Sequence, residues 1–350
     1  MDGSSTLPPI PSSPGVGMRR KGPKTLPRLP LSAFSPPNSG TSERFPLPAS
    51  PSTLHPSAII DANVVVSGDD LSLSDWRKEL TQVTQSQVNG AVVSLEGSDS
   101  KEALVSRLSG DKAANTVSSV IVPLNLDAPA PETAPAFWSS SSIPVSLTTV
   151  YTRPSPVAGE TLKWALQQGR PVDIDVQVSL TNDTFEAFED LLTRATDIDS
   201  VPPIIIKNLL PPPDELDLPI VKLMNHPSYL AYQAQTAALS LYPTLHIKFL
   251  PPTWNAPTPK SPPPGVTSTE QDVKQNKEWK RRIKMYLSPV LEAFGFERII
   301  FGSSPSSSST SASRVPDWYE LARESFAELG VEQEAIDAVF GKNAQKVYKL

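Results

Sequence analysis

The chain has 350 residues, 39 of them proline, with no cysteine and a formal net charge of −6. That length fits one large domain with a tail, or two ordinary domains. The absence of cysteine excludes disulfides, a thiolate zinc site and a cysteine nucleophile, and it is compatible with a cytoplasmic location. The mildly acidic balance argues against a nucleic-acid partner, and no apolar run reaches the roughly 18 residues that predict a membrane span.

Residues 1–56 form a compositionally distinct segment. They hold 13 of the 39 prolines, interleaved with Ser, Gly and Thr, and six Lys or Arg against two acids. Such a segment cannot bury enough apolar surface to offset the entropy of ordering, so the sequence predicts a disordered, basic Pro/Ser-rich tail. Its Pro27-Arg28-Leu29-Pro30 stretch is of the kind that docks on SH3-type domains, and the alternative is a solvated extension without a partner.

The first half of the remaining chain alternates between apolar runs and amphipathic segments. A near-continuous β-branched run predicts a buried strand over 58–66, followed by a helix over 74–87 that Ser74 would cap. A strand over 89–95, a short helix near 100–109 and a strand over 116–124 follow. After a Pro/Ser-rich stretch comes a strand over 145–150.

The second half is more regular. The pattern predicts helices over 160–169, 182–195 and 228–241, and strands over 171–180, 203–208, 245–250 and 298–302. Overlapping capping boxes, Thr267 with Glu270 or Ser268 with Gln271, would start a long helix that ends at Phe294. A last main helix spans 316–329, before Gly330.

Eight strands alternating with helices over 57–350 predict an α/β fold, a (β/α)₈ TIM barrel, as one domain behind the tail. A doubly wound open sheet is the alternative, since strand order cannot be read from a sequence. No glycine-rich phosphate loop follows any strand, so nucleotide binding has no support and no cofactor is predicted.

Three stretches resemble the amidohydrolase-related family of metal-dependent hydrolases and lactonases. Ile60-Asp61-Ala62-Asn63-Val64-Val65 is similar to the family's opening strand, Ile-Asp-Ala-His-x-His. Ile206-Lys207-Asn208 stands where its sixth strand ends in a histidine, and 294–304 is similar to Phe-Gly-x-x-Arg-x-x-Phe-Gly-Ser-Asp. The segment 335–348, with Asn343-Ala344, is similar to its final helices, and there we expect Asn343 to cap a helix.

The departures from this pattern fall on the positions where the resemblance implies metal ligands. Asn63, Val65 and Asn208 replace histidines, and Ser304 replaces the catalytic aspartate. A valine cannot ligate a metal, and the other three are poor zinc ligands. We therefore expect these four former ligand positions to line a pocket that holds no metal.

Polar residues that remain inside the barrel suggest a second possibility. The strand over 171–180 places Asp173, Asp175 and Gln177 on one face, and the strand over 245–250 places His246 and Lys248 on one face. A buried barrel strand is ordinarily apolar on both faces, so these groups are either an internal ion pair or a pocket for a small anionic ligand. Asp175 and Lys248 are the candidate catalytic residues of such a pocket.

The leading hypothesis is a catalytically silent barrel, a pseudoenzyme that binds a ligand or serves as a scaffold. The alternative is a metal-independent hydrolase or lactonase that acts on an anionic small molecule through Asp175 and Lys248. A third hypothesis is a structural protein that acts through its Pro-rich tail. The low-complexity serine loop over 303–313 and the proline-rich loop over 251–264 are not expected to organise a catalytic site.

Overall fold

A computed structural model describes residues 50–67, 73, 76–80, 88–96, 101–110, 117–207, 218–254, 256–261, 269–307, 309 and 313–350. The predicted tail therefore falls almost wholly outside the described residues, as do Asn208 and the Pro27–Pro30 motif. Residues 50–56 are described, and they contact the barrel. Arg323 donates hydrogen bonds to the carbonyls of Pro51 and Leu54, at 3.1 and 3.0 Å.

The centre of the fold is a sheet of eight parallel strands in the order β1 to β8, each hydrogen-bonded to the next in sequence. This order confirms the predicted (β/α)₈ barrel and excludes the doubly wound sheet, whose strand order reverses. The strands are β1 (Ile59–Ser67), β2 (Val88–Glu96), β3 (Val117–Pro123), β4 (Val145–Tyr151), β5 (Val172–Val176), β6 (Ile204–Lys207), β7 (Leu245–Phe249) and β8 (Ile299–Phe301).

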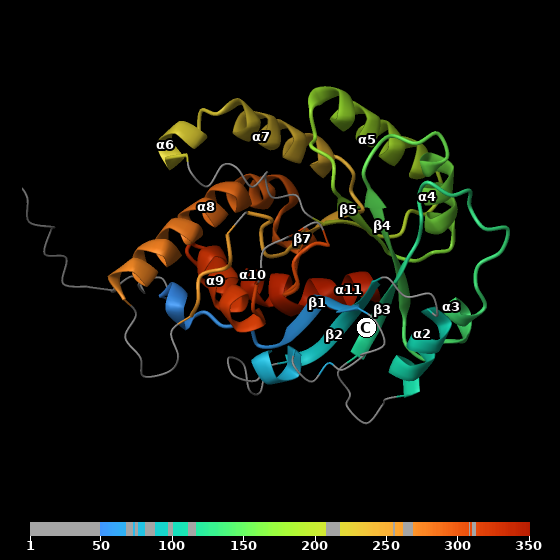
Figure 1. Ribbon diagram of the computed structural model, residues 1–350, viewed down its shortest axis with the longest axis horizontal. Coiled ribbons are helices and arrows are strands. Elements are labelled where there is room, and N and C mark those ends of the chain that lie inside the picture. Colours follow the sequence, from blue (N-terminus) through green and yellow to red (C-terminus); the bar gives the residue numbers. More distant parts are fainter. Residues whose placement is uncertain are drawn as a thin grey trace, which may run out of the picture. The chain divides into compact units, whose positions relative to one another are not determined.

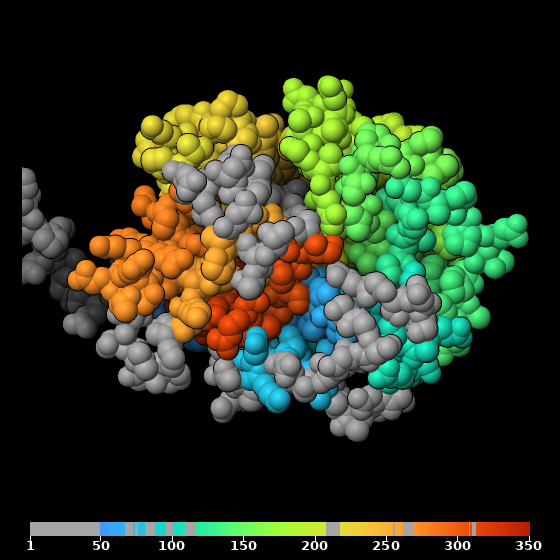
Figure 2. Space-filling view, viewed as in Figure 1, coloured from blue at the N-terminus to red at the C-terminus, as the bar shows by residue number. Residues whose placement is uncertain are grey.

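Helices surround the strands (Figure 1). They are α2 (Lys101–Gly110), α3 (Phe137–Ser140), α4 (Ala158–Gln167), α5 (Asn182–Ala195), α6 (Ile220–Leu223), α7 (Pro227–Ser240), α8 (Glu270–Phe294), α9 (Val315–Ala327), α10 (Gln333–Asp337) and α11 (Asn343–Tyr348). Short 3₁₀ turns, η2 (Pro51–Thr53) and η5 (Phe296–Arg298), and a π-helical turn, η6 (Ala338–Lys342), complete the described elements. In the space-filling view α6 and α7 (yellow) and α8 (orange) cover neighbouring parts of the outside (Figure 2).

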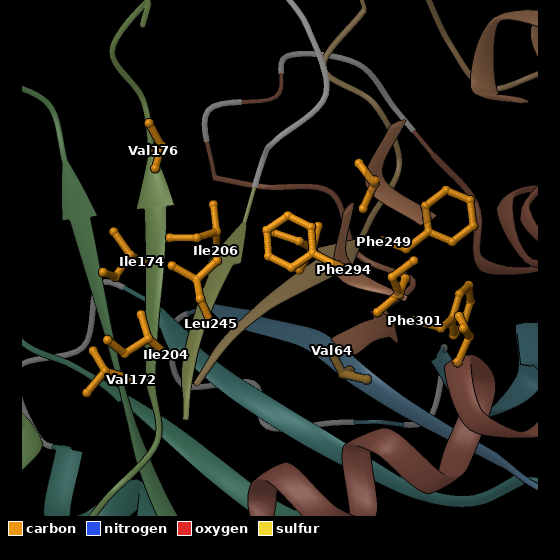
Figure 3. Packing of buried hydrophobic residues seen from close by; sticks show 14 of the residues in the cluster. Val64, Val172, Ile174, Val176, Ile204, Ile206, Leu245, Phe249, Phe294 and Phe301 are labelled. Carbon is orange, nitrogen blue, oxygen red and sulfur yellow. The ribbon is translucent and has the colours of Figure 1, made fainter. Parts of the chain in front are cut away.

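Alternation along the strands separates an outer core from an inner one. Val172, Ile174 and Val176 of β5 belong to one cluster with Ile204 and Ile206 of β6 (Figure 3), and the same cluster includes helix residues such as Phe188 and Leu192 of α5. The intervening β5 residues, Asp173 and Asp175, therefore point into the barrel. The inner apolar core is small, and α11 contributes to it: Ile60, Ala62, Val92, Ile121, Ile205, Ile300, Ala344, Val347 and Tyr348.

Polar contacts hold α11 and η5 at the end of the barrel where the strands begin. The Asn343 amide donates to the carbonyls of Phe296 and Ile299, at 2.7 and 2.8 Å. The expectation that Asn343 caps a helix is thus wrong, because its side chain binds the start of β8 instead. Arg298 donates to the carbonyls of Phe294, Ser240 and Tyr242, which joins the ends of α8 and α7 to the same region.

The seam between β1 and β8 closes the barrel through side chains and loop backbone. The Ser304 amide donates to the Asn63 carbonyl at 2.9 Å, and the Asn63 side-chain amide donates to the Ser304 carbonyl at 2.8 Å. Gly302 lies so close to β1 that a methyl group added to it would meet the Asn63 Cβ at 2.6 Å and Leu250 at 2.7 Å. The glycine is needed because no larger residue fits this seam.

The largest differences from the expected elements lie in β5, at the start of α8 and in the C-terminal segment. Strand β5 ends at Val176 rather than at residue 180, and the helix α8 is capped by Thr269 with Asp272 rather than by either predicted pair. The expected final helix is interrupted by η6, where an added Cβ on Gly341 would lie 2.6 Å from the Ala58 carbonyl oxygen. Within the described ranges, no helix has both the length and the apolar composition needed to cross a membrane.

Candidate functional site

A buried polar cluster lies at the centre of the barrel. Asp173 and Lys248 form an ion pair, and the side chains of both are completely buried. The Tyr348 hydroxyl donates to the other Asp173 oxygen at 2.9 Å, and the Lys248 amine lies 5.4 Å from the centre of the Tyr348 ring. Lys207 approaches the same carboxylate at 4.0 Å, and the Asn63 amide oxygen lies 3.4 Å from Lys248. We call Asp173, Lys248 and Tyr348 the central cluster.

Burial sets the electrostatics of the central cluster. It lowers the pKa of the Lys248 ammonium to about 8, although Asp173 favours the charged form. Burial also holds the pKa of the Tyr348 hydroxyl well above its usual value, and the Asp173 carboxylate adds to that shift. At neutral pH the cluster is therefore a charged Lys248, its carboxylate partner and a neutral phenol that donates to it. Each group satisfies another.

Asp175, one layer nearer the mouth of the barrel, belongs to a separate network. It accepts hydrogen bonds from the Ser306 hydroxyl at 2.7 Å, the Ser307 hydroxyl at 2.8 Å and the Gln177 amide at 3.1 Å. The two candidate catalytic residues thus have different partners: Asp175 is bound by the serine loop after β8, and Lys248 by Asp173. Within the described chain they make no hydrogen bond or ion pair to each other.

A cavity of about 480 Å³ opens at the mouth, where the ends of β2 to β6 meet. Its size is ordinary for a small-molecule site, and the carboxyl ends of the strands are where barrel enzymes bind their ligands. Asp175 and Lys207 reach it from β5 and β6. The residues that line it are Ser94, Leu95, Lys101, Pro123, Leu124, Asn125, Leu126, Asp127, Thr148, Thr149, Val150, Thr152, Asp175, Lys207 and Ser307.

Three of the four positions at which the resemblance implied metal ligands come together at the seam. Asn63 and Ser304 exchange the hydrogen bonds given above, and the Val65 amide donates to the Ser304 hydroxyl at 3.2 Å. These residues are not in the set that lines the mouth cavity. Asn208, the fourth position, lies outside the described residues. In the structure, Asn63, Val65 and Ser304 therefore close the barrel by holding β1 against the loop after β8.

The described donors at the seam are a poor fit for a transition metal. The Asn63 oxygen faces the Lys248 amine, Val65 offers only hydrocarbon, and the Ser304 hydroxyl already accepts from a backbone amide. No group of three or more His, Cys, Asp or Glu in the described chain is arranged to hold a metal ion. Zinc sites need three or four such ligands around one point, and a cation already stands next to Asn63.

Asp61, which is also part of the opening motif, has a structural role. It accepts hydrogen bonds from the Trp76 ring N–H at 2.8 Å, the Ser303 amide at 2.9 Å and the Ser303 hydroxyl. Its carboxylate therefore ties β1 to the loop after β8 and to the helical residues 76–80. Of the histidines, His246 contacts the Thr244 carbonyl at 2.9 Å, and burial lowers its pKa, as suits a neutral structural ring.

Sequence reasoning missed two contributors to the interior. Tyr348 was assigned only to a final helix, and nothing in its local pattern shows that it reaches Asp173. The serine loop was not expected to organise a catalytic site, and its part in holding the strands was not foreseen: Ser303, Ser304, Ser306 and Ser307 each bind a strand residue. A signal for the latter was available, because buried carboxylates such as Asp61 and Asp175 need donors and the loop after β8 is rich in hydroxyls.

Fold and interior together define a (β/α)₈ barrel with an ion pair at its centre and a polar cavity at its mouth. No family model and no curated protein matches the chain. Among solved structures, an amidohydrolase from Burkholderia multivorans with bound zinc aligns with a TM-score of 0.53 and 13% identity, over 84% of this chain and 99% of that chain. An amidohydrolase from the same organism with bound HEPES aligns with a TM-score of 0.56 and 15% identity, over the same shares of the two chains. At these identities the likeness is one of fold.

Proposed function

We propose that the chain is a small-molecule-binding barrel whose ligand occupies the mouth cavity, and that it does not carry out metal-dependent hydrolysis. The observation that supports this is the division of the interior. The central cluster is satisfied within itself, whereas the cavity above it is bordered by Lys207 and by Ser94, whose hydroxyl has no hydrogen-bond partner among the described residues. A buried ammonium such as that of Lys207, at the wall of a cavity and without a hydrogen-bond partner among the described residues, is a reason to expect a ligand.

The chemistry of the former ligand positions supports the second half of the proposal. A hydrolytic metal centre needs an open coordination position beside several protein ligands. At the described seam, the Asn63 side-chain amide donates to the Ser304 carbonyl, the Ser304 hydroxyl accepts from the Val65 amide, and Lys248 brings a positive charge to the same place. We infer that the chain shares the fold of the amidohydrolases without their metal chemistry.

Metal-independent hydrolysis by Asp175 and Lys248 has less support. A general base must reach the proton that it removes, directly or through one water. Asp175 is bound by three donors, and Lys248 is enclosed beneath the cavity with Asp173. Asp175 lines the cavity and Lys248 does not, so the two groups do not face a ligand together. A cytoplasmic location, an SH3-type partner for the Pro-rich tail, a scaffolding role for the barrel and a structural role that acts through the tail stay predictions.

A blocked cavity tests the binding function. Val150 lines the cavity and is 43% exposed, so Val150→Trp should fill the space without disturbing the outer core. Val221 on α6, which is 75% exposed, does not line the cavity and makes Val221→Trp a matched control. Saturation-transfer NMR with a library of metabolite-sized compounds should find binders of the wild type and of Val221→Trp that Val150→Trp does not bind. Equal binding by both variants would place the ligand elsewhere.

A second experiment tests the absence of metal chemistry. Elemental analysis of the dialysed protein should find no stoichiometric zinc, manganese or other transition metal. Adding zinc or manganese should not produce hydrolysis of lactone or aryl ester substrates above that of the free ion. One tightly held transition metal per chain, or metal-stimulated turnover that Val150→Trp abolishes, would refute the proposal.

A further inference from the structure

Lys207 is the charged residue of the mouth that the described contacts leave least satisfied. Its side chain is only 5% exposed, and it lines the cavity from the end of β6. In the part of the chain that the structure describes, its amine makes no hydrogen bond, and its nearest carboxylate is Asp173 at 4.0 Å. A buried ammonium at that distance from its counterion retains donors for another acceptor.

The other lysines nearby are already engaged. Lys248 has Asp173 in direct contact, and Lys101, at the opposite side of the cavity, donates to the Pro123 carbonyl at 3.0 Å. Asp173 therefore serves two amines but contacts one of them. Of the two carboxylates that line the cavity, Asp175 already accepts from two serine hydroxyls and an amide, and Asp127 lies 4.0 Å from the Arg153 guanidinium. The described wall thus offers one incompletely paired cation to whatever enters the cavity.

Charge and hydrogen-bonding capacity narrow the chemistry of the ligand. A single oxyanion beside Lys207 would complete its ion pair, because a carboxylate accepts charge-assisted hydrogen bonds from an ammonium. A phosphate brings more negative charge and more acceptors than one amine can satisfy. Because Asp175 lies on the neighbouring strand in register with Lys207, the additional charge of a phosphate would be repelled by the Asp175 carboxylate. Asn125, which is exposed and lines the cavity, has a side-chain NH₂ group that makes no hydrogen bond among the described residues and can donate to an oxygen of the same ligand.

We propose that Lys207 anchors the ligand of the mouth cavity, and that this ligand is a small carboxylic acid that also carries a hydroxyl or carbonyl oxygen. The inference rests on the proposed binding function and names its ligand class. It also replaces Lys248 with Lys207 as the residue that meets the anion. Lys248 balances Asp173 beneath the cavity, whereas Lys207 stands at the cavity wall.

Paired probes separate the carboxylate from the rest of the ligand. Mandelate and lactate are hydroxy acids, and mandelamide and lactamide are their neutral counterparts. NMR-detected titrations at neutral pH should show that the wild type binds the acids more tightly than the amides and more tightly than inorganic phosphate. Lys207→Met should weaken binding of the acids about tenfold or more, the loss expected for one charge-assisted hydrogen bond, and leave the amides unchanged.

Lys163→Met is the matched control, because it removes a lysine that pairs with Asp197 and does not line the cavity. It should bind the acids as the wild type does, and Lys207→Arg should retain part of the affinity. Unfolding midpoints show whether each variant is folded. The comparison of acids, amides and phosphate in the wild type needs no variant at all.

Several results would overturn the inference. Acids that bind Lys207→Met as tightly as the wild type would exclude Lys207 as the anchor, and a preference for phosphate would exclude the carboxylate class. Amides that bind in the cavity while acids do not would refute the anionic ligand and leave the binding function standing. If neither these probes nor the wider library bind the wild type, the proposed function fails with the inference.

Discussion

The buried ion pair between Asp173 and Lys248 can be tested with a double-mutant cycle. Both side chains are completely buried, so removing either one leaves an unpaired charge inside the barrel. Each of Lys248→Met and Asp173→Asn should lower the free energy of unfolding by about 3 kcal/mol, the usual cost of breaking a buried pair from one side. The double variant removes both charges, and it should recover most of that loss. The coupling energy should therefore be at least about 2 kcal/mol.

Urea unfolding at pH 7 provides the measurement, with tryptophan fluorescence and circular dichroism compared to establish a single transition. An exposed pair serves as a control: Lys163 and Asp197 are 3.3 Å apart, and their side chains are 26% and 85% exposed. Lys163→Met and Asp197→Asn should each cost well under about 1 kcal/mol and show little coupling. Additive losses in Asp173→Asn/Lys248→Met, or a loss no larger than in the control, would refute the assignment of a buried charge pair.

Three further outcomes follow from the structure. Because burial lowers the pKa of Lys248 to about 8 from 10.5, the unfolded chain binds more protons between those values. The wild type should therefore gain stability relative to Lys248→Met as the pH rises from 8 to 10, and an unchanged difference in unfolding free energy would contradict this. Gly302→Ala should lower the free energy of unfolding by about 1–3 kcal/mol because its new Cβ would clash at the seam. Gly159→Ala, whose new Cβ would have its nearest neighbour at 3.7 Å, should not lower it, and equal effects of the two variants would argue against a tight seam. Asn343→Ala removes two hydrogen bonds and should cost about 2 kcal/mol in thermal or urea unfolding, and a neutral effect would show that the bonds at the start of β8 are dispensable.

The strands could be predicted because their apolar, β-branched runs are buried on both faces, but the end of β5 could not. Alternation continues to residue 180, yet among the described residues β5 pairs with β4 only as far as Tyr151, whose carbonyl accepts from the Gln177 backbone N–H at 3.0 Å. The chain then turns, and the Thr184 hydroxyl donates to the Ser179 carbonyl at 2.7 Å. The end of a strand depends on where the neighbouring strand stops pairing with it, and the sequence of one segment does not show where its neighbour ends.

The candidate site shows a similar division. The inward position of Asp173 and Asp175 could be predicted, because acidic residues on a strand that is buried on both faces need partners inside the barrel. Their partners could not be chosen from the sequence. The sequence grouped Lys248 with Asp175 as the candidate catalytic residues, and the structure pairs Lys248 with Asp173. Which lysine meets which carboxylate depends on the stagger between strands, since Asp175 is in register with Lys207 on the intervening strand β6.

The contact between Tyr348 and Asp173 joins residues 175 positions apart, and it has a consequence for the order of folding. Consecutive strands pair with one another, so an open sheet can grow as each βα unit is completed. Two events must wait for the last segments: docking of Tyr348 beneath Asp173 and closure of the seam between Asn63 and Ser304, which are 241 residues apart. Until then the edges of the sheet at β1 and β8 stay open, and Asp173 stays hydrated. The last step of folding therefore expels water, satisfies the central carboxylate and removes an edge that could otherwise associate with another chain.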